Sequence, residues 1–485
     1  MEICTVGGYE EVGKNMTAVK IGEDVIIIDA GVYLPALMDL EESDTREKMT
    51  SQKMRRIKAL PNDFVLDKLG WKDKVRAIII GHAHLDHVGG IPYIAERYPK
   101  VPIYATPFTL AVLNTILDDE KIVLRNKQIP VHPDSNFTIR GKSGSYKVDF
   151  IHVTHSTIQT VFPVIHTPEG CLVYTLDFKF DNFPTMEGPP NYKKMEEIAR
   201  EGVLVMIVDA LYSGTDRKTP SERIARHLLE DAFSVAMGDN KNALFVTTFS
   251  SHIARLRSIV EFGRKTGREI VVMGRSMNKY IGAAQKVNKG PFKKNVRLLK
   301  YRKQINSFLR KVERNRGRYL IVCTGHQAEK NSIMDRLVKG ETPFNFRSGD
   351  NVIFASSVIP TPSSIVNRDK MDKKLRSNGV RVQTDIHVSG HPSKGDLREL
   401  LNIFKSTHII PAHGTLQQEA PMIELATEFG YKFGETSHLS SDGKVLEFKP
   451  RQITKSKTKS HSKNRNSKRN KRQNKRQNKR GNKRQ

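Results

Sequence analysis

Four short apolar runs in the first 210 residues each stop at a polar residue, and this pattern constrains the fold more than any other. Runs of β-branched and other apolar residues of this length are typical of buried strands. We therefore expect strands that carry polar side chains to one rim of a sheet. The runs cover residues 25–28, 76–81, 172–176 and 203–208, and the polar residues that follow them are Asp29, His82, Asp177 and Asp209.

The pattern changes twice along the chain, and this indicates an inserted domain. After about residue 209, helical stretches alternate with strand-like runs, which is typical of a doubly wound α/β domain. From residue 385 to about 450 the earlier style returns, with a histidine at the end of each short strand. The expected helices cover 221–236 and 252–266, and the expected strands cover 243–247, 269–273, 318–323 and 351–355. The expected divisions are a first part at 1–208, an inserted domain at 209–368 and a second part at 369–450.

The net charge of +29 over 485 residues is concentrated at the carboxyl end. Residues 451–485 contain 16 Lys or Arg, no acid and no aromatic residue, and they repeat a Lys-Arg-Gln-Asn unit. Such a segment cannot offset the entropy of ordering itself, so we expect a disordered basic tail. Surplus positive charge favours a polyanionic partner, and a phosphate backbone suits this tail.

Composition indicates a cytoplasmic protein without a membrane segment. No apolar stretch approaches the ~20 residues that a membrane-spanning helix needs. The acidic Glu2 takes the place of the basic residues that begin a secretory signal. Cys4, Cys171 and Cys323 are far apart and lie in apolar runs, so we expect three reduced, buried thiols.

The hexapeptide His82-Ala83-His84-Leu85-Asp86-His87 directly follows one of the expected strands. In an extended segment His82 and His84 point to the same side. Where the chain then turns toward a helix, Asp86 and His87 can point to a neighbouring position. Four ligands within six residues therefore predict two adjacent metal ions.

Further ligands are expected from the ends of other strands. His155, Asp177 and His413 are the candidates. Imidazole and carboxylate ligands without thiolate suit a catalytic Zn²⁺ or Mn²⁺ site. Two such ions ~3.5–4 Å apart would hold the attacking and leaving oxygens of a displacement at phosphorus.

These residues resemble the β-CASP group of metallo-β-lactamase-fold nucleases, and within it the RNase J family, over residues 1 to about 450. The short layout after residue 450 is more similar to the archaeal branch. The resemblance implies an α/β fold, namely a metallo-β-lactamase αββα sandwich with an inserted doubly wound β-CASP domain and a disordered basic C-terminal tail. Besides the hexapeptide, Asp29, His155, Asp177 and His413, the matching segments are Gly7-Gly8, Glu11-Val12-Gly13-Lys14-Asn15-Met16, Gly274-Arg275-Ser276-Met277, Thr324-Gly325-His326-Gln327-Ala328-Glu329 and His387-Val388-Ser389-Gly390-His391.

The resemblance also implies roles for single residues. One metal ion would be held by His82, His84, His155 and Asp177, and the other by Asp86, His87, Asp177 and His413. Asp29 would orient these ligands from behind. Asp86 is also a candidate proton acceptor, and His391, held by Asp209, would protonate the leaving 3′-oxygen or stabilise its charge.

The segment from Thr248 to His252 resembles the part of RNase J that binds a terminal 5′-phosphate and stacks a base. A closed phosphate pocket one nucleotide from the metal ions would make the enzyme an exonuclease that releases mononucleotides. The alternative is an ordinary helix N-cap near Ser250 or Ser251 with no ligand. The candidate pocket residues are Phe249, Ser250, Ser251, His252, His387, Ser389 and Gly390.

The resemblance thus implies a ribonuclease that acts in RNA decay and processing and holds two divalent ions per chain. We expect Zn²⁺, with Mn²⁺ as the alternative. We expect mainly 5′-to-3′ exonuclease action on single-stranded RNA with 5′-monophosphate ends. A homodimer is expected, with the tail on the RNA backbone or on ribosomal RNA. The alternatives are a β-CASP endoribonuclease of the 3′-end-processing kind, an inactive RNA-binding scaffold and, less suited to the inserted domain, a small-molecule metallohydrolase.

Overall fold

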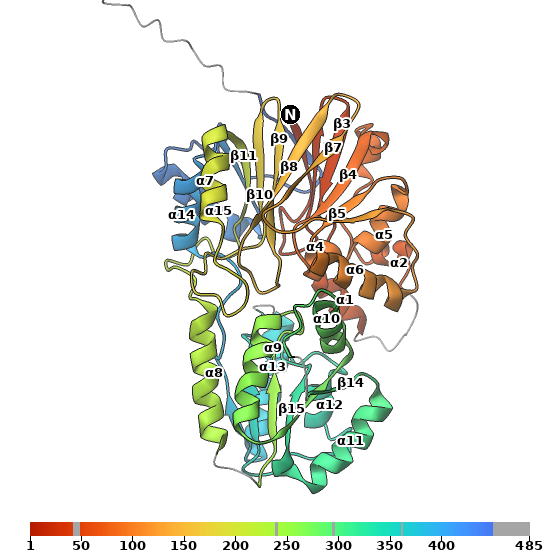
Figure 1. Cartoon of the computed structure of the whole chain (residues 1–485), viewed down its shortest axis with the longest axis vertical. Helices are drawn as coiled ribbons and strands as arrows, with labels where there is room; N and C mark the ends of the chain where they lie inside the picture. Colours follow the sequence, from red (N-terminus) through yellow and green to blue (C-terminus); the bar gives the residue numbers. More distant parts are fainter. Residues whose placement is uncertain (42–48, 238–240, 293–295, 360–361, 450–485) are drawn as a thin grey trace, which may run out of the picture. The chain divides into compact units, whose positions relative to one another are not determined.

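The computed structural model describes residues 1–41, 49–237, 241–292, 296–359 and 362–449 (Figure 1). The expected basic tail at 451–485 lies outside the described residues. Residues 1–449 form one compact unit. Among the helices of the described ranges, none has the length and apolar character that crossing a membrane requires.

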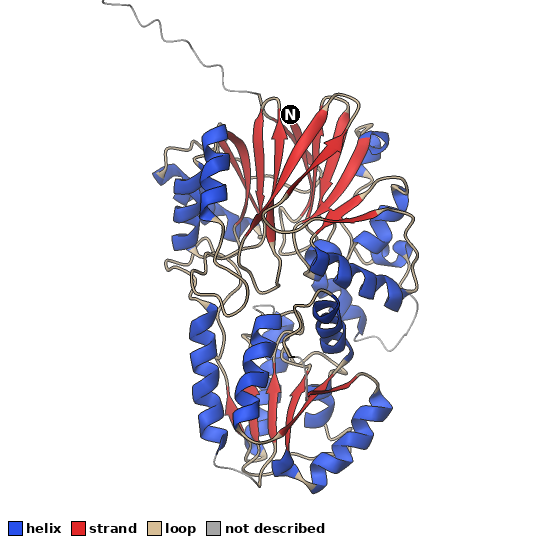
Figure 2. Cartoon of the chain, viewed as in Figure 1, coloured by secondary structure: helices blue, strands red, loops and turns tan. Residues whose placement is uncertain are grey.

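Two sheets face each other across a shared apolar core (Figure 2). Ile26 and Ile28 of the first sheet pack in this core with Phe150 and Leu172 of the second. The first sheet has the order β19 (Lys444–Glu447), β1 (Glu2–Gly7), β2 (Met16–Ile21), β3 (Asp24–Ile28), β4 (Val75–Ile80), β5 (Ile103–Ala105) and β6 (Gln128–Pro130). The second has the order β18 (His408–Ala412), β11 (Val203–Asp209), β10 (Gly170–Thr175), β9 (Val161–Thr167), β8 (Ser145–His152) and β7 (Asn136–Arg140).

Helices cover the outer faces of both sheets, which completes the expected αββα sandwich. Phe108 of α6 packs against Ile78 of the first sheet, and Met195 of α7 packs against Val173 of the second. Within the described part, residues 34–60 contain two helices. The helices of this lobe are α1 (Leu34–Glu41), α2 (Ser51–Arg56), α3 (Val65–Lys68), α4 (Leu85–Val88), α5 (Ile91–Ile94), α6 (Pro107–Glu120), α7 (Tyr192–Glu201), α14 (Lys394–Phe404) and α15 (Leu416–Glu428).

The third sheet is entirely parallel and has helices on both faces, as a doubly wound domain requires. It is inserted between β11 and β18, which are themselves parallel neighbours in the second sheet. Its order is β14 (Val296–Leu299), β13 (Glu269–Met273), β15 (Tyr319–Cys323), β12 (Leu244–Thr247), β16 (Asn351–Phe354) and β17 (Arg381–Gln383). Its helices are α8 (Glu222–Met237), α9 (Ile253–Lys265), α10 (Arg275–Lys286), α11 (Arg302–Arg314), α12 (Ile333–Val338) and α13 (Pro362–Ser377).

The end of the inserted lobe differs from the expected boundary at residue 368. That residue lies inside α13, and the third sheet continues to β17, which pairs with β16. Strand β17 has only three residues, so its apolar pattern is too short to be distinguished from a loop. Backbone pairing therefore places the end of the lobe at Gln383 or later.

The loop that follows β3 approaches the backbone of the hexapeptide closely at Gly31. The amide of Val32 donates to the carbonyl of Leu85 at 3.0 Å, and the amide of Ala30 donates to the carbonyl of His87 at 2.9 Å. A Cβ atom at Gly31 would lie 1.6 Å from the carbonyl oxygen of Asp86. The position of the hexapeptide therefore depends on a glycine at residue 31.

We expect Gly31→Ala to lower the free energy of unfolding by about 2–3 kcal/mol, because the added methyl group forces backbone to move. Urea unfolding of the purified protein measures this change. Gly188→Ala is the matched control, since a Cβ there meets no atom within 4 Å. Equal stability of the two variants would contradict the close approach.

Candidate active site

The first group of potential metal ligands joins the hexapeptide to two other strand ends. The Nε2 atoms of His82 and His155 lie 3.2 Å and 3.0 Å from Nδ1 of His84. The Oδ2 atom of Asp177 lies 3.6 Å from Nε2 of His82. One ligand atom from each of these four residues lies within 4.8 Å of the others, so the group could hold one ion.

The second group shares Asp177 with the first. Nε2 of His87 lies 3.3 Å from Oδ2 of Asp177 and 3.8 Å from Oδ2 of Asp86. Nδ1 of His413 lies 3.9 Å from Oδ1 of Asp177. Asp86, His87, Asp177 and His413 again offer ligand atoms within 4.8 Å of one another. The structure thus brings together both sets of ligands expected from the sequence.

The chemistry of Asp177 fits divalent ions at these positions. Its carboxylate is buried, and neither oxygen has a hydrogen-bond donor. A buried carboxylate without donors costs several kcal/mol unless positive charge compensates it. Imidazole nitrogens and carboxylate oxygens are ligands that Zn²⁺ and Mn²⁺ both accept.

The protonation of the histidines follows from burial and from the nearby carboxylates. Burial lowers the pKa of His84 to about 4 and lowers the pKa of His155 well below its usual value. These imidazoles are therefore neutral and can donate a lone pair to an ion. At His87, burial also favours the neutral ring, but the charges of Asp177 and Asp29 outweigh it and raise the pKa well above 6.5. The centre therefore favours positive charge.

Hydrogen bonds on the far side of the rings orient the ligands. Oδ2 of Asp29 accepts from Nδ1 of His87 at 2.7 Å, while its Oδ1 accepts from the amide of Gly81 at 2.9 Å. Nδ1 of His155 donates to the carbonyl of Gly390 at 2.7 Å. Such contacts determine which ring nitrogen faces an ion. Gly390, expected in the nucleotide pocket, thus contacts a metal ligand.

Asn15 is a site residue that sequence reasoning did not single out. Its Nδ2 atom lies 3.0 Å from Nε2 of His87 and 2.9 Å from Nδ1 of His413. The amide of Asn15 donates to the carbonyl of Asp86 at 3.0 Å. Its position in the matching segment 11–16 is the sequence signal that could have identified it.

His391 and Asp209 form a pair beside the two ligand groups. Nδ1 of His391 lies 2.8 Å from Oδ2 of Asp209 and 3.8 Å from Oδ2 of Asp177. Burial alone would lower the pKa of His391, but the charges of Asp209 and Asp177 raise it to about 9. Because Nδ1 is held by Asp209, Nε2 is the nitrogen left for another partner.

The inserted lobe contacts the hexapeptide directly. Oγ of Ser251, between β12 and α9, lies 3.2 Å from Nε2 of His84. The hydroxyl of Tyr280 in α10 donates to the carbonyl of Ala83 at 3.3 Å. One face of the ligand groups is therefore built by the third sheet and its loops.

Several expected pocket residues are engaged with their own surroundings. Nδ1 of His252 accepts from the amide of Arg255 at 3.4 Å, so His252 is the N-cap of α9. The alternative of an N-cap at Ser250 or Ser251 is therefore corrected by one or two residues. Oγ of Ser389 accepts from the amide of His391 at 3.0 Å.

Phe249 and His387 come together with a third ring, that of His326. The centroid of Phe249 lies 4.1 Å from that of His326 and 5.9 Å from that of His387. Both ring nitrogens of buried His326 lack a hydrogen-bond partner, and so does Nδ1 of His387. These rings form an aromatic and imidazole cluster, and Nδ1 of His326 also lies 3.5 Å from Oε1 of Glu329.

Arg255 of α9 and Glu222 of α8 form a buried ion pair near this cluster. Arg255 donates to both carboxylate oxygens of Glu222, at 2.6 Å and 2.8 Å. It also donates to the carbonyls of Ala355 and Ile386, each at 2.9 Å. Glu222 is in turn 3.3 Å from Nε2 of His252. No sequence pattern distinguishes Arg255 from the surface arginines, so sequence reasoning missed this pair.

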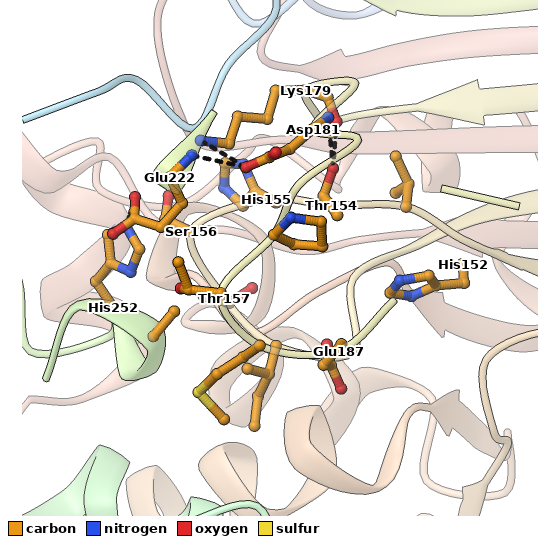
Figure 3. Close-up of a pocket in the computed structure, with 16 residues that line it drawn as sticks. His152, Thr154, His155, Ser156, Thr157, Lys179, Asp181, Glu187, Glu222 and His252 are labelled. Atoms are coloured by element: carbon orange, nitrogen blue, oxygen red, sulfur yellow. Dashed lines mark hydrogen bonds and ion pairs between the residues drawn. The ribbon is translucent and has the colours of Figure 1, made fainter. Parts of the chain in front are cut away.

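A polar pocket lies beside the ion pair and borders both His155 and His252 (Figure 3). Lys179 and Asp181 line it, and both are buried. Nζ of Lys179 donates to the carbonyl of Pro220 at 3.3 Å and lies 3.6 Å from Asp181. Lys179 and Asp181 lie two and four residues after Asp177, and this spacing is the signal that could have placed them near the site.

Three family models match successive parts of the chain. Residues 9–189 match the metallo-beta-lactamase superfamily, and residues 241–371 match the model described as Ribonuclease J, beta-CASP domain. Residues 379–433 match the Zn-dependent metallo-hydrolase RNA specificity domain. The three matches follow the order of sandwich, inserted lobe and returning segment.

Whole-chain relatives agree with these matches. Ribonuclease J of Pyrococcus abyssi is 39% identical over 449 residues, which cover 92% of this chain and 97% of that protein. Ribonuclease J of Methanocaldococcus jannaschii is 38% identical over 451 residues, which cover 93% and 99%. A crystal structure of a protein of unknown function from Enterococcus faecalis has a TM-score of 0.60 at 16% identity and covers 92% of this chain and 99% of its own, which shows likeness of fold alone.

We expect the purified protein to contain two divalent ions per chain and His84→Ala to contain about one, because only the first group loses a ligand. Elemental analysis after dialysis measures the metal content. His132→Ala is the control, since His132 is exposed and belongs to neither group. A His84→Ala protein that keeps both ions would contradict the assignment of the groups.

Proposed function

The chain belongs to the ribonuclease J family, in its archaeal-type branch, and from that premise we propose a two-metal exoribonuclease that degrades single-stranded RNA from the 5′ end. Family membership makes it a ribonuclease with a metallo-hydrolase fold. The direction of cleavage, the preference for a 5′-monophosphate and the release of mononucleotides are the proposed parts. The pair of ligand groups that share Asp177 supports hydrolysis with two ions, and the contact between Ser251 and His84 supports action at a 5′ end.

His82, His84, His155 and Asp177 would hold one divalent ion, and Asp86, His87, Asp177 and His413 the other. Such ions, when bound, supply Lewis-acid chemistry that makes water a better nucleophile and offsets charge at phosphorus. We propose Zn²⁺, in agreement with the family model that matches 379–433. The homodimer expected from the resemblance remains part of the proposal.

Proton transfer falls to Asp86 and His391. The side chain of Asp86 is 15% exposed, so it can accept a proton from a water molecule that approaches phosphorus. Nε2 of His391 can give a proton to the leaving 3′-oxygen, while Asp209 holds Nδ1. The charge of Asp209 raises the pKa of His391 and so favours the protonated ring.

The loop before α9 supports recognition of a 5′ end. Ser251 contacts His84, so a phosphate bound at this loop would lie beside the first ligand group. Partial positive charge at the start of a helix favours an anion there. Phe249 offers a ring for the terminal base, and the ring of His387 lies 5.9 Å from it, centroid to centroid. His252 would act indirectly, because its two nitrogens are held by Arg255 and Glu222.

Digestion of RNAs that carry a 3′ label and either a 5′-monophosphate or a 5′-hydroxyl tests this function. We expect mononucleotide products and faster digestion of the 5′-monophosphate RNA. His84→Ala should bind both RNAs and cleave neither. Immediate internal fragments without any preference for the 5′ end would contradict the exonuclease and favour the endoribonuclease. Binding without cleavage by the metal-loaded parent protein would favour the scaffold.

We expect Asp209→Asn to shift the alkaline limb of the pH–rate profile to lower pH. Loss of the Asp209 charge lowers the pKa of His391, so the protonated ring is lost earlier as the pH rises. His391→Ala should lower turnover by roughly 10²- to 10⁴-fold, the usual scale for a proton-transfer group. Both variants should keep the parent's metal content. An unchanged alkaline limb in Asp209→Asn would refute the role of His391 as the acid.

A further inference from the structure

The segment 297–318 of the inserted lobe is strongly basic. It contains nine Lys or Arg residues and a single acid, Glu313. Most of the segment is helix α11, and the remainder flanks it on the way from β14 to β15. None of these residues belongs to the two ligand groups or to the loop before α9.

Helix α11 separates its apolar and basic residues onto opposite faces. At about 100° per residue, the basic positions center on the direction opposite to the buried ones. The buried residues, which pack in the core of the third sheet, are Ile305, Phe308, Leu309 and Val312. The exposed basic residues, called here the basic face, are Arg302, Lys303, Arg310, Lys311 and Arg314.

The basic face is not neutralised by neighbouring acids. Glu313 is held by Arg316 and Arg347, and Glu269 by Arg297. In the part of the chain that the structure describes, no ion pair joins the five side chains of the basic face to an acid. Like charges held together on one helix repel one another, and a bound polyanion relieves that repulsion.

The basic face begins at the same end of the third sheet as the expected nucleotide pocket. Strands β12, β13 and β14 are parallel, so the loops that follow them all lie at the carboxyl end of the sheet. Phe249 follows β12, and Tyr301 follows β14. From Tyr301, helix α11 runs for about 20 Å. It lies on the side of the inserted lobe opposite to α8 (Figure 1).

An exposed aromatic residue accompanies these cations. Tyr301 is 58% exposed, and Nζ of Lys300 lies 5.7 Å from the centroid of its ring. Aromatic rings beside basic side chains are typical of surfaces that bind single-stranded nucleic acid. A membrane surface fits less well, because the apolar face of α11 is packed in the core and cannot enter lipid.

We propose that the basic face of α11, with Tyr301, is an accessory binding surface for the RNA chain outside the active site. The five cations contact phosphates without reading sequence, and the ring of Tyr301 stacks on a base. This proposal rests on the proposed function, because the bound polyanion is the RNA substrate itself. The surface would hold long RNAs while their ends are processed.

The test compares two full-length variants that lose the same charge, both in the His84→Ala background so that RNA is bound without cleavage. The first carries Lys303→Gln, Arg310→Gln, Lys311→Gln and Arg314→Gln. The control carries Lys100→Gln, Lys127→Gln, Lys142→Gln and Lys193→Gln, four exposed lysines of the sandwich. Both keep the tail at 451–485, so its contribution is the same in each arm. Affinity is measured over a range of salt for a long single-stranded RNA and for a trinucleotide.

We expect the basic-face variant to bind the long RNA about tenfold more weakly than the control. The slope of log affinity against log salt should fall by about 0.7 for each phosphate contact that is lost. The loss for the trinucleotide, which carries too few phosphates to contact all five cations, should be smaller. Thermal unfolding compares the folding of the two variants. If the quadruple variant is destabilised, the pair Arg310→Gln and Lys311→Gln should give the same change at reduced size.

Equal affinity and equal slope for the two variants would overturn the proposal, because net charge alone would then explain binding. An equal loss for trinucleotide and long RNA would also overturn it. Affinity for polyglutamate is measured on the same two variants. If the basic-face variant loses affinity for polyglutamate but not for RNA, the surface binds acidic proteins instead. These results do not depend on cleavage, so a failed proposal leaves the digestion test of the proposed function intact.

Discussion

The buried carboxylate of Asp177 is the group on which the rest of the structure depends. It has no hydrogen-bond donor, and it belongs to both ligand groups. A buried charge of this kind is stable only where positive charge surrounds it. The ends of β4, β10 and β18 must therefore meet at one point, although β4 belongs to the first sheet and the others to the second. The sandwich is the arrangement that brings these ends to a common rim.

The place of insertion links the third sheet to the same rim. Strands β11 and β18 are neighbours, and the inserted lobe leaves after one and returns before the other. Asp209 ends β11, and His391 lies on the returning segment, so their 2.8 Å contact closes the insertion. Ser251 and Tyr280 then reach the hexapeptide from within the lobe. The proposed acid and the proposed 5′-end pocket therefore both depend on how the lobe is attached.

Burial of charge also decides which residues of the inserted lobe remain free to contact a ligand. Arg255 is fully buried, and Glu222 and two backbone carbonyls satisfy its guanidinium. Because Glu222 also lies against His252, that histidine is held in place and caps α9. The rings of Phe249, His326 and His387 lie together outside this ion pair, and Phe249 and His387 remain the proposed contacts for a nucleotide. In the proposed pocket, His252 would therefore act as a support, and Phe249 and His387 would contact the nucleotide.

The sequence by itself determined the types of ligand, their order and the two styles of the chain, because these depend on local periodicity and on residues close in sequence. The six expected strands and helices of the inserted lobe match observed elements within one or two residues, whereas β14, β17 and helices α10 to α13 were not expected. Only the tertiary structure decided which nitrogen of each histidine faces the centre, that Gly390 holds His155, and that Arg255 joins Glu222. Those contacts connect residues far apart in the chain, for example 235 positions between His155 and Gly390, and only packing of the folded chain selects such partners.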